Sequence, residues 1–441
     1  MTLPTGFSFT QPTTADRAEV LAHSSLVWAS THPVSDLLTL PQPYEDERAV
    51  IVRDQHGQIA AFHASYEFSQ FPTPGGDIRA GGLTWVGVHP QYRRRGILRA
   101  MIAEHFRLST QAGEAISVLF AAEPTIYGRF GYGAAAFDVR CTFGRGAALR
   151  PLAPTTPTSL QEHASSTHEP LTIRIETYDP TQHTQLIETV HKAAGRNVGG
   201  TGLNRPGWVT RDTPALVAAH HHTISLTPGK EPQRIIVVER NGTPVGYTRF
   251  RRTMSWQNTG PQGRVDAGEV VALDPAASHT LWTTLLDLDL TSEVTAFMLP
   301  TDDPIITQLN NNRSIGMTVV DNVWVRILDL PAALSARQYS GSIDLVLKVT
   351  DDMLPHNAGC WRVRAQPFGG PHGDDAPRVE RTDAPADVTL DIRELSALYL
   401  GGVSAASLAA GGLVTADTPQ ALAQLSSAMA WPLAPCSSWV F

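Results

Sequence analysis

Residues 83–109 read LTWVGVHPQYRRRGILRAMIAEHFRLS, and this stretch guides the interpretation of the rest of the chain. Thr84–Val88 has the apolar character of a buried strand, and His89-Pro90 ends it. From residue 97 onward the apolar residues recur at helical spacing and predict a helix with one apolar face. That face consists of Ile97, Met101, Ile102, Phe106 and Leu108. The stretch therefore predicts a strand, a basic loop over Gln91–Gly96 and a helix, as in an α/β or α+β unit.

The loop between the predicted strand and helix has the chemistry of an anion site. A helix N-terminus presents unpaired backbone N–H groups and a partial positive charge. Gly96 lets the backbone approach a phosphate closely. Three consecutive arginines add charged donors: Arg93, Arg94 and Arg95. The loop has neither GxxxxGK followed by Ser or Thr nor GxGxxG, so it predicts a pyrophosphate site outside the nucleoside-triphosphate and dinucleotide folds. The spacing alone also fits a solvated basic loop that caps a helix.

The composition limits the partners of this chain. It has 441 residues, which suggests roughly three domains at about 150 residues each. There are 42 acidic and 34 basic side chains, which gives a formal charge of −8. This balance argues against nucleic acid or an anionic membrane as the main partner, and it is compatible with a cationic substrate. The sequence has no run of 18 apolar residues and no basic, apolar leader, so we expect a cytoplasmic protein without a membrane span.

The cysteines and histidines give no disulfide or metal framework. Cys141, Cys360 and Cys436 are far apart and form no Cys-x-x-Cys pair, so we interpret them as small hydrophobes or idle thiols. His220–His222 has no second ligand cluster at metal-binding spacing. We interpret this tract as a solvated loop or a helix C-terminus. The sequence therefore predicts no metal site.

Composition shifts divide the chain into three regions. Arg150–Pro170 is rich in Pro, Thr, Ser and Ala, which is typical of a linker or a long surface loop. Asn241-Gly242 joins two β-rich runs and predicts a hairpin. A further region follows the sequence LDLPAALSARQ. We place boundaries near residues 160 and 331, which gives the regions 1–160, 161–331 and 332–441.

The sequence VGVHPQYRRRG (86–96) resembles the acetyl-CoA-binding signature of the GNAT N-acetyltransferases, with Arg93, Gly96 and Leu98 at its key positions. A leucine in place of the usual small residue at position 98 is shared by the Eis (enhanced intracellular survival) branch of bacterial aminoglycoside and lysine N-acetyltransferases. Other stretches that resemble this branch are IYGRFGYG (126–133), DDPIITQLNNNR (302–313), DNVWVRILDLPAAL (321–334), LSALYLGG (395–402) and the C-terminal phenylalanine.

The resemblance implies an α+β protein with tandem GNAT-like domains, each a mixed sheet flanked by helices, and a sterol-carrier-like α+β domain at the C-terminus. Region 1–160 would bind acetyl-CoA, and region 161–331 would be a second GNAT-like copy without the signature. Region 332–441 would be the sterol-carrier-like domain. Members of the branch assemble as hexamers, so the resemblance also implies a homohexamer.

The resemblance assigns roles to individual residues. Val86, Gly87 and Val88 would hold the pantetheine arm through their backbone. Arg93 belongs to the signature, and the pyrophosphate would be wrapped by the residues that follow it: Arg94, Arg95, Gly96, Ile97, Leu98 and Arg99. Ala122 and Glu123 would line the CoA cleft. Tyr127 matches the tyrosine assigned as general acid, and Phe441 would supply its α-carboxylate as general base.

These roles describe acetyl transfer by direct attack of an amine on a thioester, because no Ser or Cys stands beside an obvious base. A tyrosine with an ordinary pKa of about 10 is matched to a thiolate whose acid has a pKa of about 8.5. Tyr132 is a rival of Tyr127 for this role. The end Trp439-Val440-Phe441 is apolar enough to be buried, which raises the pKa expected for its carboxylate.

The acceptor stays open at this stage. By resemblance we expect aminoglycosides or lysine-like and polyamine-like amines, with a role in antibiotic resistance as one possible setting. A protein lysine acetyltransferase would use the same chemistry on another acceptor. The alternative of another class is a ligand-binding protein, in which the sterol-carrier-like domain holds an apolar ligand and the acetyl-CoA site is vestigial.

Overall fold

The computed structural model describes residues 3–153, 170–222, 230–370 and 376–441. These residues form two compact units. Unit 1 holds the described residues up to Phe137, the segment 206–222 and the chain from Asp321 to Phe441. Unit 2 holds the described residues of 138–205 and of 225–320. Both units are therefore discontinuous in sequence.

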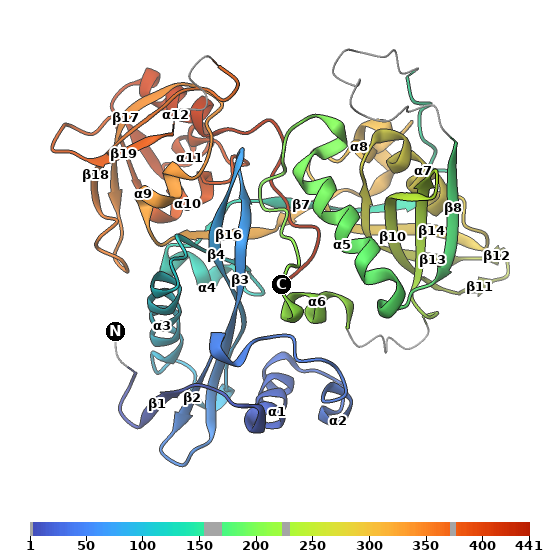
Figure 1. Ribbon diagram of the computed structural model, residues 1–441, viewed down its shortest axis with the longest axis horizontal. Coiled ribbons are helices and arrows are strands. Elements are labelled where there is room, and N and C mark those ends of the chain that lie inside the picture. The colour runs from blue at the N-terminus through green and yellow to red at the C-terminus, as the bar shows by residue number, and fades with distance from the viewer. Residues whose placement is uncertain (1–2, 154–169, 223–229, 371–375) are drawn as a thin grey trace. The chain divides into compact units, whose positions relative to one another are not determined.

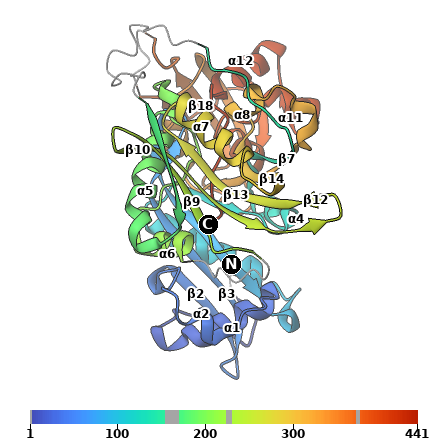
Figure 2. The ribbon, with the colours of Figure 1, turned by 90° about the vertical axis from the view of Figure 1, so that its right-hand side faces the viewer.

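Unit 1 contains a seven-stranded mixed sheet with the order β1-β2-β3-β4-β5-β16-β6. Its strands are β1 (Phe7–Thr10), β2 (Ala49–Asp54), β3 (Ile59–Thr73), β4 (Gly76–Val88), β5 (Ile116–Phe120), β6 (Gly133–Ala134) and β16 (Val323–Ile327). The accompanying helices are α1 (Arg17–Trp28), α2 (Val34–Leu37), α3 (Ile97–Gln111), α4 (Pro124–Tyr127) and α6 (Pro214–His221). Figure 1 and Figure 2 both show α1 and α2 beside β2 and β3. The predicted strand, loop and helix of residues 83–109 are confirmed as the end of β4, the loop after it and α3.

Strands β4 and β5 separate along their length. They pair in parallel from Ala80↔Ile116 to Gly82↔Val118, and the register ends there. Beyond Gly82, β4 continues to pair with β3 on its other side, across a register shift near Trp85, whose φ is 56°. A non-glycine residue with this φ is uncommon and accompanies a local bend of the strand. The result is a gap between the ends of β4 and β5.

The two faces of this sheet pack against different partners. Alternate residues of a strand point to opposite faces. On β5, Ser117 and Leu119 point toward α3, where Ser117 bonds to a histidine of the helix and Leu119 packs with Phe106. Val118 and Phe120 point the other way, into the cluster that contains the carboxy-terminal domain. This difference determines on which side each part of the site lies.

The carboxy-terminal part of unit 1 is a five-stranded sheet with the order β19-β18-β17-β20-β21. Its strands are β17 (Ile343–Thr350), β18 (Gly359–Ala365), β19 (Arg378–Arg381), β20 (Val388–Asp391) and β21 (Val414–Ala416). Its helices are α9 (Leu330–Ser335), α10 (Ile392–Leu398), α11 (Ala405–Ala410) and α12 (Pro419–Met429). A buried ion pair joins it to the first sheet, because Arg326 of β16 lies 2.7 Å from Asp351.

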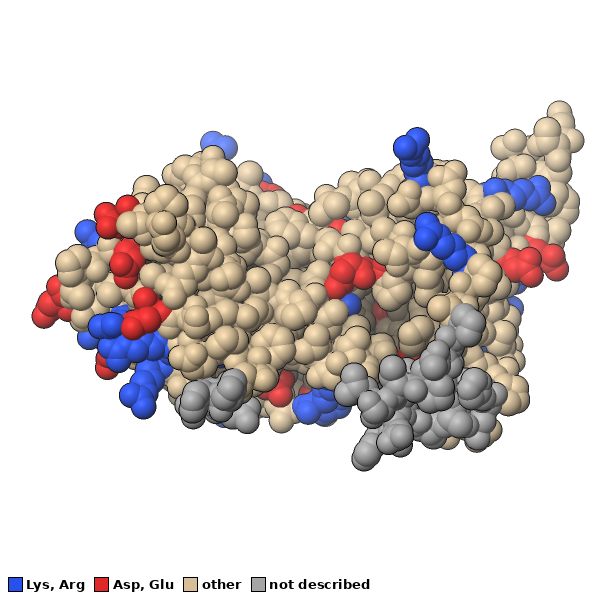
Figure 3. Space-filling view, turned by 90° about the horizontal axis from the view of Figure 1, so that it is seen from above, with Lys and Arg blue, Asp and Glu red and all other residues tan. Residues whose placement is uncertain are grey.

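The exposed surface of this part carries both signs of charge. Figure 3 shows acidic and basic side chains interspersed on its left-hand side, where this domain lies. Arg362 pairs with Asp344 at 2.7 Å, and Arg364 pairs with Glu380 at 3.5 Å. The charges on this face therefore largely compensate each other.

Unit 2 contains a second seven-stranded sheet with the order β15-β7-β14-β13-β10-β9-β8. Its strands are β7 (Phe137–Gly144), β8 (Leu171–Thr177), β9 (Arg234–Arg240), β10 (Thr243–Thr253), β13 (Gly263–Ala272), β14 (Thr291–Pro300) and β15 (Thr318–Asp321), with a small hairpin of β11 (Trp256–Gln257) and β12 (Gly260–Pro261). Its helices are α5 (Pro180–Arg196), α7 (Pro275–Leu286) and α8 (Pro304–Gln308). The predicted hairpin at Asn241-Gly242 is confirmed between β9 and β10, with φ of 52° and 74° at the two turn residues.

Each large sheet contains one strand from a distant part of the sequence. β16 follows the whole of unit 2 in the chain, yet it lies between β5 and β6 in the sheet of unit 1. β7 precedes residue 150, yet it lies between β15 and β14 in the sheet of unit 2. The predicted boundary near 160 lies outside the described residues, and residue 331 lies within α9. Both boundaries stay predictions.

The histidine tract forms the end of a helix. His220 and His221 are the last residues of α6, and both are buried. The helix C-terminus is therefore confirmed, and the solvated loop is wrong. Within the described ranges no group of three or more His, Cys, Asp or Glu is placed to hold a metal ion. In the same ranges no helix combines the length and apolar character needed to cross a membrane.

Candidate functional site

The loop after β4 is exposed, and two of its residues have left-handed backbone conformations. A short 3-10 turn, Pro90–Tyr92, follows β4, and the Tyr92 hydroxyl donates to Asp54 at 2.7 Å. Arg93–Gly96 are exposed. Arg94 has a φ of 63° and Gly96 has a φ of 86°. Because left-handed backbone favours glycine, a strained Arg94 beside Gly96 indicates a loop whose shape is specified by its surroundings.

Helix α3 begins without a capping side chain. Its N-cap is Gly96, and no side chain accepts a hydrogen bond from the first turn. A Cβ atom on Gly96 would meet nothing within 4 Å, so the space in front of the helix is open. Ile97 is buried, Leu98 is half-buried and Arg99 is exposed. The free N–H groups, the helix dipole and the exposed Arg93–Arg95 together suit a diphosphate better than they suit a loop that merely caps a helix.

The equivalent strand-to-helix step in unit 2 is built differently. There α7 follows β13, and Asp274 caps it by accepting from the Ala277 N–H at 3.0 Å. Arg240 pairs with the same carboxyl group at 2.8 Å. A carboxylate at this position satisfies the amide that a phosphate needs and repels the phosphate. This is the physical reason why the second sheet lacks a diphosphate site at α7.

The remaining predicted cofactor residues lie on the two sides of the gap between β4 and β5. On the β4 side, Val86 and Val88 are half-buried and Gly87 is buried. On the β5 side, Ala122 and Glu123 are exposed and follow the strand directly. An extended chain such as a pantetheine arm can pair with the open edge of a strand. The gap therefore suits the role that the resemblance assigned to these residues.

Tyr127, the predicted general acid, is the last residue of α4. Its side chain is 8% exposed, and its ring contacts the ring of Tyr132 with 5.8 Å between centroids. Its hydroxyl has no hydrogen-bond partner in the described part of the chain. Burial and the nearby Glu123 carboxylate raise the pKa of Tyr127 to about 12. The hydroxyl therefore stays protonated at neutral pH, but it is a weaker acid than an ordinary tyrosine.

Tyr132, the rival for this role, is already engaged. It is fully buried, and its hydroxyl lies 2.7 Å from Ser117 Oγ. The same Oγ lies 2.7 Å from Nε2 of His105 on α3. Burial raises the pKa of Tyr132 strongly. The closed chain of three side chains leaves Tyr132 facing the protein interior, so the geometry favours Tyr127.

The C-terminal Phe441 is buried instead of frayed. Its side chain is 7% exposed, and the rings of Phe68 and Phe120 lie edge-on at 4.9 and 5.0 Å between centroids. Trp439 contacts it as well, at 5.8 Å. Among the described Lys, Arg and His side chains, none forms an ion pair with its α-carboxylate. An apolar cage thus holds the ring and leaves the carboxylate without a cationic partner.

The two predicted catalytic residues belong to opposite faces of the sheet. Tyr127 lies in the cluster on the α3 face, together with Leu119. Phe441 lies in the cluster on the other face, together with Phe120. The gap between β4 and β5 separates the two faces at this end of the sheet. A reaction that uses both residues must therefore take place at the gap, with one substrate arriving from each face.

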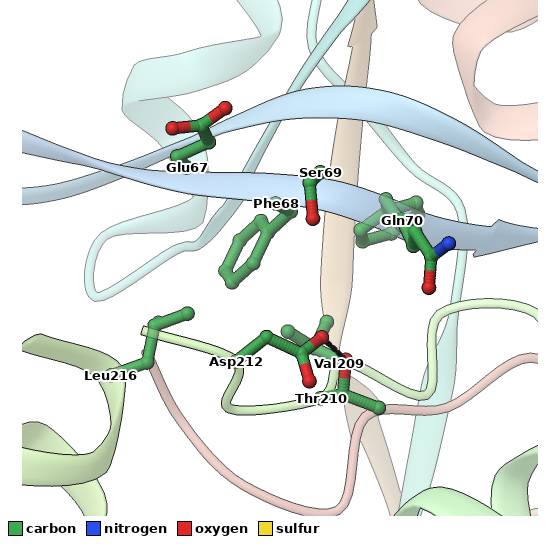
Figure 4. A pocket seen from close by; sticks show the side chains of 9 residues that line it. Glu67, Phe68, Ser69, Gln70, Val209, Thr210, Asp212 and Leu216 are labelled. Atoms are coloured by element: carbon green, nitrogen blue, oxygen red, sulfur yellow. Dashed lines mark hydrogen bonds between the residues drawn. The ribbon is translucent and has the colours of Figure 1, made fainter. Parts of the chain in front are cut away.

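A small hollow lies on the Phe441 face. Its lining consists of Glu67, Phe68, Ser69, Gln70, Phe71, Val209, Thr210, Asp212 and Leu216. Figure 4 shows the Phe68 ring on the side of β3 that faces the segment of Asp212, whereas the Glu67 carboxylate lies on the other side of the strand. Glu67 pairs with Arg79 at 3.0 Å, and Asp212 accepts from the Thr210 hydroxyl at 2.5 Å. The Asp212 carboxylate on a small hollow beside Phe68, which itself contacts Phe441, suits an ammonium group.

Sequence reasoning missed the segment 206–222. Val209 and Asp212 line the hollow, and Phe68 faces them from β3. None of these residues stands in a motif, because their proximity depends on contacts between distant parts of the chain. The one local signal is the apolar pair Trp208-Val209, which is typical of a buried anchor.

Family models match three ranges of the chain. Residues 9–135 and residues 207–327 each match a model described as an acetyltransferase (GNAT) domain. Residues 330–438 match a model described as a sterol carrier protein domain. The predicted α+β architecture of two GNAT domains followed by a sterol-carrier-like domain is confirmed.

Several known proteins are similar over most of their length. The chain is 34% identical over 363 residues to an N-acetyltransferase of Streptomyces avermitilis, which covers 82% of each chain. It is 30% identical over 393 residues to N-acetyltransferase Eis of Mycobacterium tuberculosis, which covers 87% of this chain and 86% of that protein.

Two solved structures share the fold. Eis1 of Mycobacterium abscessus has a TM-score of 0.75 at 24% identity, covering 99% of this chain and 100% of that one. A GCN5-related N-acetyltransferase of Anabaena variabilis has a TM-score of 0.77 at 18% identity, with the same coverage.

Proposed function

Because this chain belongs to the Eis-like family of GNAT N-acetyltransferases, we propose that it moves acetyl from acetyl-CoA to a primary amine of a cationic small molecule by direct attack. The observation that carries the proposal is the buried Phe441, whose ring contacts Phe68, a residue that lines the same hollow as Asp212 on the face opposite α3.

The acetyl donor occupies the α3 face in this proposal. The open N-terminus of α3 and the exposed arginines Arg93–Arg95 hold its diphosphate. The pantetheine arm runs along the free edge of Val86–Val88 toward the gap, past Ala122 and Glu123. The thioester then lies where Tyr127 and the backbone of β4 both reach it.

The reaction joins the two faces of the sheet. The acceptor amine approaches from the hollow, and the Phe441 carboxylate takes a proton from it. The amine nitrogen forms the new C–N bond, and the C–S bond to CoA breaks. A backbone N–H within Val86–Val88 stabilises the charge that develops on the carbonyl oxygen.

Tyr127 assists departure of the thiolate. With the pKa of Tyr127 at about 12, full proton transfer to a thiolate whose acid has a pKa of about 8.5 is uphill by roughly 3 to 4 units. The hydroxyl therefore acts mainly by donating a hydrogen bond to the sulfur, which lowers the charge on the leaving group. The released CoA thiolate takes its proton from water.

The proposal is tested by thiol release from acetyl-CoA with a panel of amines. We expect turnover with at least one aminoglycoside, polyamine or lysine peptide, and faster turnover with polycationic than with monocationic amines. The protein must have an untagged C-terminus, because a tag converts the Phe441 carboxylate into an amide. Acetyl-CoA binding without turnover on any amine would contradict the proposed acceptor class. Absence of both binding and turnover would support the alternative of a ligand-binding protein with a vestigial acetyl-CoA site.

Removal of the acidic group of the hollow tests the acceptor side. In the variant Asp212→Asn, we expect KM for a polycationic acceptor to rise about 2- to 5-fold, because one exposed contact between opposite charges contributes up to about 1 kcal/mol. KM for acetyl-CoA should stay within twofold, since the donor binds on the other face.

The matched control for this variant is Asp344→Asn. Asp344 is also an exposed carboxylate, but it lies on the carboxy-terminal sheet, where it pairs with an arginine. An equal rise of KM for a neutral acceptor analogue in Asp212→Asn would contradict a role of this charge. The homohexamer, the cytoplasmic location and a role in antibiotic resistance stay predictions from the resemblance.

A further inference from the structure

The C-terminal tail of unit 1 is held by hydrogen bonds along its main chain. The Cys436 N–H donates to the Pro206 carbonyl at 3.0 Å. Three residues nearer the end, the indole N–H of Trp439 donates to the Val209 carbonyl at 2.9 Å. The segment that supplies both acceptors is the stretch 206–222 of unit 1. The tail is therefore bound along one side before the chain ends at Phe441.

Asn322 binds the tail from a second direction. Its Oδ1 accepts from the Ser437 N–H at 2.8 Å, and its Nδ2 donates to the Ser437 carbonyl at 3.1 Å. The side chain is fully buried. One amide that satisfies both main-chain groups of one residue does what a neighbouring strand does in a sheet. Loss of the amide leaves the buried Ser437 N–H without this acceptor and leaves its carbonyl only the weak thiol donor of Cys436 at 3.3 Å, which is costly.

Asn322 is itself rigidly placed. It is the single residue between β15 and β16, strands of two different sheets. Its own N–H donates to the Ala136 carbonyl at 2.9 Å, and the Val323 carbonyl accepts from the N–H groups of Ala135 and Ala136. Asn322 is thus fixed at the start of β16, the strand with which the chain re-enters the sheet of unit 1 after unit 2.

The bonds to Ser437 bear on the position of the terminal carboxylate. The Ser437 hydroxyl donates to the Trp439 carbonyl at 2.8 Å, which shapes the last turn of the tail. The Trp439 ring lies between the guanidinium of Arg211 and the ring of His220, at 5.5 and 5.4 Å from its own centre. Catalytic groups lose much of their effect when they move by about 1 Å. A tail detached at Ser437 would keep the Cys436 N–H bond, the Trp439 side chain and the Phe441 ring as anchors, but it would lose the two main-chain bonds to Asn322.

We propose that Asn322 is a positioning residue that clamps Ser437 and thereby holds the Phe441 carboxylate at the gap between β4 and β5. The inference rests on the proposed function, in which that carboxylate accepts the proton of the amine. It also gives the second GNAT domain a purpose: both points at which the chain returns from unit 2, residues 206–209 and Asn322, hold the catalytic tail.

The experiment compares Asn322→Ala with the matched control Asn357→Ala in the full chain. Asn357 is also a fully buried amide that clamps main chain, since it accepts from the Leu330 N–H at 3.0 Å and donates to the Ile327 and Leu328 carbonyls. It does not touch the tail in the described structure. Both variants remove a buried amide, so both are expected to melt at lower temperature.

The first readout is release of Phe441 by a carboxypeptidase that prefers aromatic ends, followed well below the melting temperatures. We expect release at least tenfold faster from Asn322→Ala than from the wild type or from Asn357→Ala. An unchanged rate would overturn the clamp. Should the alanine variant fail to fold, Asn322→Asp serves as the second variant, because it keeps the acceptor for the Ser437 N–H and loses the donor. We expect it to release Phe441 at an intermediate rate.

The second readout is kinetic. We expect Asn322→Ala to lower kcat 10- to 100-fold with KM for acetyl-CoA within twofold, and Asn357→Ala to stay within threefold of the wild type. In a chain that lacks Phe441, adding Asn322→Ala should lower kcat no further, whereas a multiplicative loss would overturn the positioning role. If no amine is a substrate, the proposed function fails, and the carboxypeptidase comparison still decides whether Asn322 holds the tail.

Discussion

Deletion of Phe441 is expected to lower kcat by roughly 10²- to 10⁴-fold, the range for loss of a positioned general base, while acetyl-CoA binding stays intact. The deletion moves the α-carboxylate onto Val440, whose side chain is 61% exposed. It also removes the ring that Phe68 and Phe120 hold. The carboxylate therefore still exists but no longer has a defined place. Steady-state kcat with the best amine and calorimetric titration of acetyl-CoA measure the two effects separately.

Two further variants separate the carboxylate from the ring. Phe441→Leu keeps a terminal carboxylate and an apolar side chain, so we expect kcat within about tenfold of the wild type, because a smaller side chain fills the cage less completely. A C-terminal extension keeps the ring and converts the carboxylate into an amide, so it should be as damaging as the deletion. Wild-type rates from the extended chain would contradict the role of the carboxylate.

Tyr127→Phe is expected to lower kcat by about 10²-fold, at the low end of the range for acid catalysis. The reason is the pKa of about 12, which makes the hydroxyl a hydrogen-bond donor to the sulfur and a poor source of a full proton. Because Tyr127 stays protonated, its ionisation should cause no fall of the wild-type rate below about pH 10. The pH profile of kcat/KM from pH 6 to 10 and the single-turnover rate at saturating acetyl-CoA measure these effects.

Tyr132→Phe is the matched control, since it removes the same hydroxyl from the neighbouring ring. The lost bond to Ser117 is buried, so the cost should appear in stability, at about 1 to 3 kcal/mol, and kcat should stay within about threefold. Equal losses of kcat in the two variants would contradict the assignment of Tyr127. Urea unfolding of both variants gives the stability comparison.

The donor side of the site could be predicted from local patterns. The strand of Thr84–Val88, the left-handed turn at Gly96 and the helix from Ile97 depend on interactions between residues a few positions apart. The Asn241-Gly242 hairpin is of the same kind. The resemblance of 86–96 to a family signature adds acetyl-CoA as the expected ligand, and the roles of the individual residues stay predictions.

The pKa of Tyr127 shows where a local pattern is insufficient. The sequence indicates a tyrosine of ordinary acidity, whereas packing against Tyr132 and the nearby Glu123 carboxylate raise its pKa. Desolvation depends on how many atoms surround a group in the folded chain, which no spacing of residues in the sequence specifies.

The acceptor side was decided by the tertiary structure. Asp212 and the other residues that line the hollow carry no motif, whereas Phe441 was assigned by the resemblance and only its burial and its neighbours come from the fold. The bonds that place them join residues far apart, from Asn322 to Ser437 across 115 positions and from Val209 to Trp439 across 230. Local sequence determines the elements that short-range hydrogen bonds and periodic apolar faces can build. Which side chains surround the C-terminus depends on how whole sheets pack together. Contacts between residues so far apart in the sequence form only when burial of the core offsets the entropy lost in closing the loops between them.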